Sequence, residues 1–80
     1  MDDQDVLDGI NQLAHEEHQL FEKESRGEAS DEERQRLHTL QVQLDQCWDL
    51  LHQRRALRRA GDDPDRAAIR DERTVEGYIG

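Results

Sequence analysis

Four consecutive residues, His15-Glu16-Glu17-His18, are of the types that bind metal ions. The two histidines are three positions apart, whereas the zinc metalloprotease motif needs a spacing of four on one helical face. In the heptad pattern of this segment only Glu17 falls on the inward face, and both histidines face outward. We therefore expect a solvated polar surface and no cofactor, with a metal site formed by His15, Glu16, Glu17 and His18 as the alternative.

Cys47 is the only cysteine, which excludes a disulfide within the chain. It lies within an apolar repeat, and its neighbours Gln46, Trp48 and Asp49 include no cation that would lower the pKa of a thiol. The pattern predicts a reduced cysteine that packs as a small apolar side chain.

Four arginines, Arg54, Arg55, Arg58 and Arg59, are close enough together to contact phosphates. The acidic start of the chain, at Asp2 and Asp3, is expected to neutralise them in the folded protein, so nucleic acid is not an expected partner. The sequence contains no glycine-rich phosphate loop and no Ser-His-Asp set. It predicts no catalytic residue and a protein that is not an enzyme.

These residues are carried by two predicted helices, over about 3–25 and 31–60. Ser30 is a good N-cap for the second helix, with Glu33 three positions later to complete a capping box. Gly27 and Gly61 follow the two helices. A glycine in this position can adopt the left-handed backbone conformation that ends a helix. Because the connection between the helices is short, the predicted fold is all-α, an antiparallel two-helix coiled-coil hairpin.

One register of this hairpin aligns its apolar residues. Residues that face each other in it have numbers that add to 57, and the same register places Asp3 beside Arg54 and Asp2 beside Arg55. The four apolar pairs are Leu20 with Leu37, Leu13 with Leu44, Ile10 with Cys47, and Val6 with Leu51.

More apolar side chains are present than two helices can bury against each other, which implies a partner. We expect two hairpins to form a homodimer as a four-helix bundle. The alternatives are that this surface binds another protein or the chain's own tail. The expected partner interface consists of Leu7, Ala14, Phe21, Trp48, Leu50 and Leu57.

The chain divides into a helical hairpin over 1–61 and a polar C-terminal tail over 62–80. A short helical turn is predicted from Asp65 to Arg70, after Pro64. Beyond it the tail is either extended and disordered, or docks through Val75, Tyr78 and Ile79.

The net charge is −9, and residues 1–33 alone carry −10. No apolar run is long enough to span a membrane, and the acidic start lacks the basic region of a signal peptide. These features predict a cytoplasmic protein without membrane contact.

The segment Leu44-Asp45-Gln46-Cys47-Trp48-Asp49-Leu50-Leu51, continuing into Gln53-Arg54-Arg55-Ala56-Leu57-Arg58, resembles the signature of a small actinobacterial family catalogued only as a domain of unknown function. The tail Val75-Glu76-Gly77-Tyr78-Ile79 and the acidic opening are similar to that family too. The resemblance implies a bacterial helical protein and assigns no site residue. We expect a structural or protein-interaction module, or alternatively an acidic regulator that occupies a basic surface of another protein.

Overall fold

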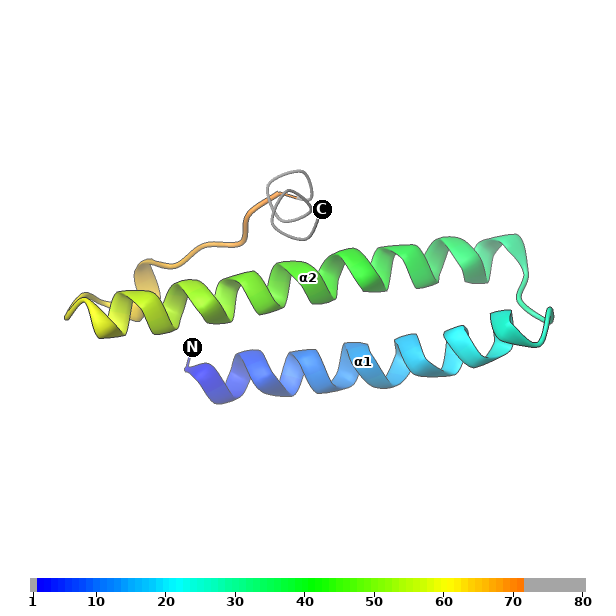
Figure 1. The fold of residues 1–80 in the computed structure, drawn as a ribbon, viewed down its shortest axis with the longest axis horizontal. Helices are drawn as coiled ribbons and strands as arrows, with labels where there is room; N and C mark the ends of the chain where they lie inside the picture. Colours follow the sequence, from blue (N-terminus) through cyan, green and yellow to red (C-terminus); the bar gives the residue numbers. More distant parts are fainter. Residues whose placement is uncertain (1, 72–80) are drawn as a thin grey trace.

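The computed structural model describes residues 2–71 and shows two long antiparallel helices that pack side by side (Figure 1). α1 spans Asp3–Ser25 and α2 spans Asp31–Arg59, and a single 3-10 turn, η1, follows at Pro64–Arg66. The predicted all-α hairpin is therefore confirmed. Its dimerisation into a four-helix bundle stays a prediction.

Both helices begin with a capping box, in which a side chain at the N-cap and one three residues later bond each other's backbone amides. At α2 the pair is Ser30 and Glu33, as the sequence predicts. At α1 the pair is Asp2 and Asp5, with hydrogen bonds of 2.9 and 3.1 Å. Asp2 is thus used as a cap.

Each helix ends at a glycine with a positive φ, 70° at Gly27 and 76° at Gly61. A left-handed residue lets the following amides turn back onto the last carbonyls of the helix. Glu28 donates to the Lys23 carbonyl at 3.0 Å, and Asp62 donates to the Leu57 carbonyl at 2.8 Å. α2 itself ends at Arg59, one residue before the predicted end, with Ala60 as its C-cap.

The core is the seam between the two helices. Leu40 and Leu51 are fully buried, and each such side chain stabilises the fold by roughly 1.5–3 kcal/mol. The main apolar cluster joins both helices near the open end of the hairpin, where Asp3 contacts Arg54 in the predicted register. The cluster consists of Val6, Ile10, Leu44, Leu50 and Leu51, with Leu7, Leu13, Cys47 and Ala67 packed against it.

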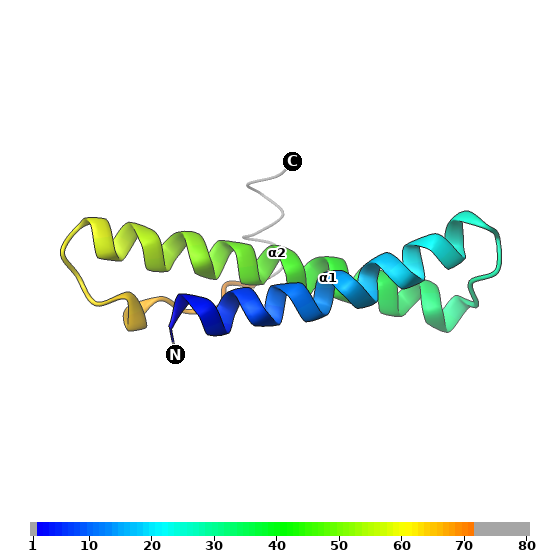
Figure 2. The same cartoon turned by 90° about the horizontal axis from the view of Figure 1, so that it is seen from below.

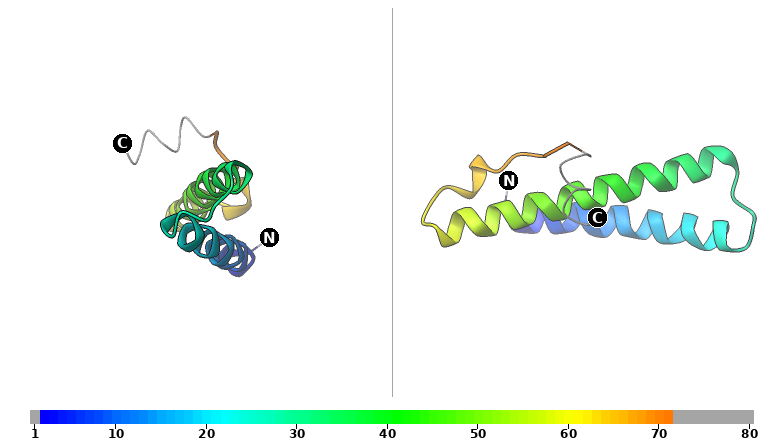
Figure 3. Two further views of the ribbon diagram at one scale, coloured as in Figure 1. Left: turned by 90° about the vertical axis from the view of Figure 1, so that its right-hand side faces the viewer. Right: turned by 45° about the horizontal axis from the view of Figure 1, so that its top comes forward.

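Residues 62–71, the return segment, double back along α2 (Figure 2). The Gln53 side-chain amide donates to the Ala68 carbonyl at 2.8 Å and accepts from the Ala68 amide at 3.3 Å. Further along, Gln46 donates to the Arg70 carbonyl at 3.2 Å. The return segment therefore covers one flank of α2 (Figure 3). Its helical part is the turn Pro64–Arg66, shorter than the predicted Asp65 to Arg70.

Candidate protein-interaction surface

The residues of the His-Glu-Glu-His segment do not converge on one point. His15 hydrogen-bonds to Gln19 and His18 pairs with Glu22, each one turn along α1. Glu16 instead reaches across to α2. Within residues 2–71, no three His, Cys, Asp or Glu side chains are close enough together to hold a metal ion.

Cys47 is half-buried against the apolar cluster. Burial raises the pKa of its thiol, which keeps the sulfur protonated and a poor nucleophile at neutral pH. Its position fits the predicted role as a small apolar side chain.

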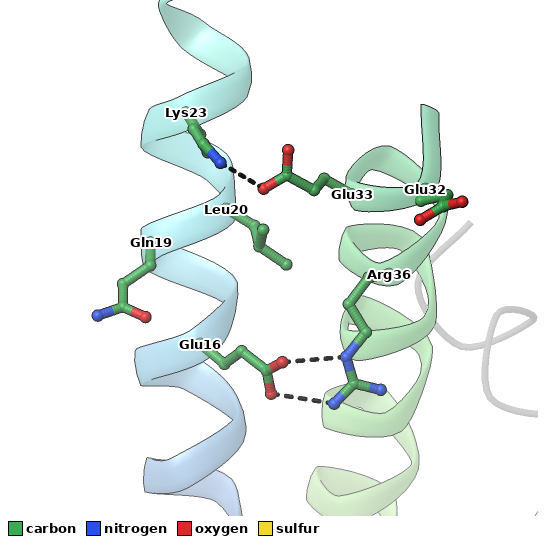
Figure 4. A pocket seen from close by; sticks show the side chains of 7 residues that line it. All are labelled: Glu16, Gln19, Leu20, Lys23, Glu32, Glu33 and Arg36. Atoms are coloured by element: carbon green, nitrogen blue, oxygen red, sulfur yellow. Dashed lines mark hydrogen bonds and ion pairs between the residues drawn. The ribbon is translucent and has the colours of Figure 1, made fainter. Parts of the chain in front are cut away.

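One groove lies between the helices near the Gly27 turn, and its charges other than Glu32 are paired with each other (Figure 4). Arg36 donates two hydrogen bonds of 3.0 Å to Glu16, and Lys23 lies 2.6 Å from Glu33. Hydrogen bonds from these cations hold the pKa values of Glu16 and Glu33 below their usual range. These charges join α1 to α2.

A second groove, here called the Trp48 groove, lies on the opposite side of the hairpin, as the helical spacing of its lining residues shows. Its lining is a mixture of apolar and polar side chains, among them the carboxylates of Glu17 and Asp45. Neither carboxylate has an ion pair among residues 2–71, and no cation lines the groove. The lining residues are Ile10, Asn11, Ala14, Glu17, Gln41, Leu44, Asp45 and Trp48.

The predicted interface residues divide between the two sides of the hairpin. Trp48 and Phe21 are 43% and 54% exposed, and Ala14 is exposed beside Trp48. Leu7, seven positions before Ala14, lies on the same stripe of α1 and is half-buried. These four residues share the side that carries the Trp48 groove.

Leu50 and Leu57 lie on the other flank of α2. Leu50 is only 7% exposed, because it belongs to the core cluster against which Ala67 packs. Leu57 is half-buried. The return segment thus covers part of the predicted partner interface. Val75, Tyr78 and Ile79, predicted to dock, lie outside the described residues.

The four arginines near the end of α2 also divide into two pairs. Arg54 is 4% exposed and donates from Nε to Asp3 and from Nη1 to Asp65, each at 2.9 Å. Arg58 donates two more hydrogen bonds to Asp3. Hydrogen bonds from Arg58 and Arg54 hold the pKa of Asp3 well below its ordinary value. Asp3, Arg54, Arg58 and Asp65 form what we call the Arg54 cluster.

The expected contact between Asp2 and Arg55 is wrong, since Asp2 caps α1 and Arg55 is exposed. The contact of Asp65 with Arg54 was not predicted from the sequence. Gly61 and Pro64 are the sequence features that could have indicated the role of Asp65. A glycine with a left-handed backbone ends the helix, and a proline soon after it turns the chain back toward that helix.

A family model described as "Protein of unknown function (DUF2630)" matches residues 2–80. The chain belongs to the DUF2630 family. Its relatives include the uncharacterized proteins Rv0898c of Mycobacterium tuberculosis (strain ATCC 25618 / H37Rv) and Mb0922c of Mycobacterium bovis (strain ATCC BAA-935 / AF2122/97). Each is 47% identical over 79 residues, covering 98% of this chain and 91% of the relative. No solved structure gives a significant match.

The DUF2630 match confirms the resemblance to an actinobacterial family. It includes the Trp48 groove and the Arg54 cluster, so both features lie in the region that defines DUF2630. In the part of this DUF2630 chain that the structure describes, neither helix is both long and apolar enough to cross a membrane.

Proposed function

We propose that this DUF2630 protein is a non-enzymatic, cytoplasmic interaction module that acts as a homodimer. Its docking surface lies on the side of the hairpin that carries Trp48, Phe21, Ala14 and Leu7. The observation that carries the proposal is the exposure of Trp48 in a partly apolar groove, on the side that the return segment leaves open.

The energetics support a partner on this side. A chain of this size has a thin core, and two helices alone leave large apolar side chains in water. A tryptophan that becomes buried removes a large apolar area from water, and its indole N–H can still find an acceptor at the edge of an interface. Two hairpins packed through this side give the four-helix bundle, a common solution for helices with a second apolar stripe.

The absence of enzymatic activity is proposed on the same grounds. Both grooves are open along the surface, so a substrate in either would stay in contact with water. Both cations of the first groove are paired with carboxylates, Lys23 with Glu33 and Arg36 with Glu16, and the Cys47 thiol is protonated.

Sedimentation of the full-length chain at tens of micromolar tests the proposal. We expect a dimer for the wild type and a monomer for Trp48→Ala. The matched control is Ile69→Ala, which removes a somewhat more exposed apolar side chain, 55% against 43% for Trp48, from the return segment. Circular dichroism checks that both variants are helical. A monomeric wild type, or a Trp48→Ala dimer as tight as the wild type, would contradict the proposal.

The second candidate is an acidic regulator that covers a basic surface of another protein. Glu17 and Asp45 support it, since they flank Trp48 and have no ion pair among residues 2–71. A monomeric wild type that binds a basic amphipathic peptide, with affinity that falls steeply with salt, is the result expected for this candidate.

A further inference from the structure

We propose that the two hairpins of the dimer pack antiparallel, with Arg55 of each copy against Asp45 of the other and Arg59 against Glu17 of the other. This inference rests on the proposed self-association through the Trp48 side. It adds the orientation of the two copies and the residues that recognise each other.

The first step is a comparison of the cations. Among residues 2–71, every lysine and arginine except two forms an ion pair within the chain. The exceptions are Arg55 and Arg59, both exposed near the end of α2. They are therefore the cations that this region of the chain can offer to a partner.

The second step concerns the Trp48 groove. A partner that covers Trp48 also removes water from Glu17 and Asp45, which line the same groove. Removing water from a carboxylate is costly unless a cation takes the place of that water. The occupant of the groove must therefore bring cations, and a second copy brings Arg55 and Arg59.

The third step is the order of residues along α2. Asp45, Trp48, His52, Arg55 and Arg59 follow one another at alternating spacings of three and four, so they form one stripe. The stripe is acidic at its start, aromatic in its middle and basic at its end. Two such stripes are complementary only when they run in opposite directions, as a twofold axis across α2 allows.

The fourth step is the register. If Arg55 faces Asp45 of the second copy, facing positions on the two α2 helices have numbers that add to 100. Arg59 then lies opposite position 41, one residue from the level of Glu17, which faces position 40 in the register of the hairpin. Both carboxylates of the groove therefore receive an arginine in a single arrangement.

The same register makes a prediction about α1. By the hairpin register in which Asp3 contacts Arg54, Leu7 lies at the level of position 50, where the twofold axis would cross. Leu7 should therefore meet Leu7 of the second copy. Trp48 should lie near His52 of the second copy.

A parallel packing of the hairpins satisfies fewer groups. It would place Arg55 over the start of α1, where Asp2 and Asp5 already cap the helix and Asp3 already binds Arg54 and Arg58. Glu17 and Asp45 would then be covered without a cation. The antiparallel arrangement avoids this cost. It overlaps the two α2 helices from position 41 to Arg59, so Phe21, at the level of position 36, lies outside the contact.

Charge reversal in the full-length chain tests the pairing. We expect Asp45→Arg alone and Arg55→Asp alone each to weaken dimerisation by roughly tenfold or more, because each places like charges opposite one another. The double variant should return to within roughly threefold of the wild-type dissociation constant. The matched control is Glu32→Arg, an equal change of charge at an exposed carboxylate that lines the other groove, which should leave the dimer unchanged.

A disulfide trap tests the orientation independently. In a Cys47→Ser background, the cysteine of the Leu7→Cys variant should form a disulfide with the same cysteine of the second copy under mild oxidation, because the two positions meet on the twofold axis. Ala14→Cys, two helical turns away, should not. The inference would be overturned if the wild type is a dimer but the double variant does not regain dimerisation and Leu7→Cys forms no disulfide. That result would still support the proposed dimer. A monomeric wild type would overturn both.

Discussion

Arg54 and Asp3 are 51 positions apart in the sequence, and the Nε of Arg54 lies 2.9 Å from an oxygen of Asp3. The same guanidinium bonds Asp65 and the Pro64 carbonyl, so one side chain joins α2 to the start of α1 and to the return segment. Planar donors on several edges make arginine suited to such a junction.

Replacing Arg54 with methionine should lower the melting temperature by roughly 10 °C, because Asp3 and Asp65 lose a shared partner while the apolar volume is largely kept. Arg54→Lys should lie between the wild type and Arg54→Met, since an ammonium group keeps the charge but has all its donors on one nitrogen, whereas Arg54 uses Nε for Asp3 and Nη1 for Asp65. Arg34→Met is the control, because the pair between Arg34 and Asp31 is a surface contact within α2. Equal melting temperatures for Arg54→Met and Arg34→Met would contradict the junction.

Acid should destabilise the hairpin. Ion pairs hold the pKa values of Asp3, Asp65, Glu16 and Glu33 lower in the folded than in the unfolded chain. Their contribution is therefore complete above the ordinary carboxyl pKa of about 4 and is lost as pH falls through the lower folded values. Thermal melts of the wild type and Asp3→Asn should differ at neutral pH and converge in strong acid. A difference that stays constant with pH would rule out this origin.

The seam should depend strongly on Leu51, which is fully buried. Leu51→Ala should reduce the free energy of unfolding by about 2–5 kcal/mol through lost burial and the cavity left behind. Leu57→Ala, the same substitution at a half-buried position, should cost less. Urea titration measures both, and equal losses would mean that Leu57 is as well packed as Leu51.

Gln53 should hold the return segment to α2, since its side-chain amide bonds both backbone groups of Ala68. In Gln53→Ala the amide of Ala68 should exchange with solvent faster, while the amides in the middle of α1 keep their protection. Hydrogen exchange by NMR resolves the two regions. Gln35→Ala, on an exposed position of α2, is the control. Unchanged exchange at Ala68 would show that other contacts hold the segment.

The features that the sequence predicts correctly are local or periodic. Ser30 with Glu33, and the glycines at 27 and 61, act within one turn of their own positions. The contact between Asp3 and Arg54 follows once two apolar stripes are aligned. The burial of Leu50 was not predictable in this way, because Leu50 is covered by an irregular segment whose path carries no periodicity.

The sequence shows that more apolar side chains are present than two helices can bury. It does not show which of them remain exposed together on one side of the hairpin. Spacing places Leu7, Ala14 and Trp48 on exposed stripes, yet it cannot say which side the return segment takes. The division of the arginines was hidden for a related reason. Asp65 reaches Arg54 through a turn whose direction depends on backbone angles after Gly61.

The contacts along the hairpin differ greatly in sequence separation, which has a consequence for the order of folding. Lys23 and Glu33 are ten positions apart across the Gly27 turn, whereas Arg54 and Asp3 meet only after the whole hairpin has closed. Closing a short loop costs less chain entropy than closing a long one. Contacts between the two helices should therefore form first near the Gly27 turn and then progressively toward the open end of the hairpin. The Arg54 cluster would be the last contact to form on folding and the first to break on unfolding.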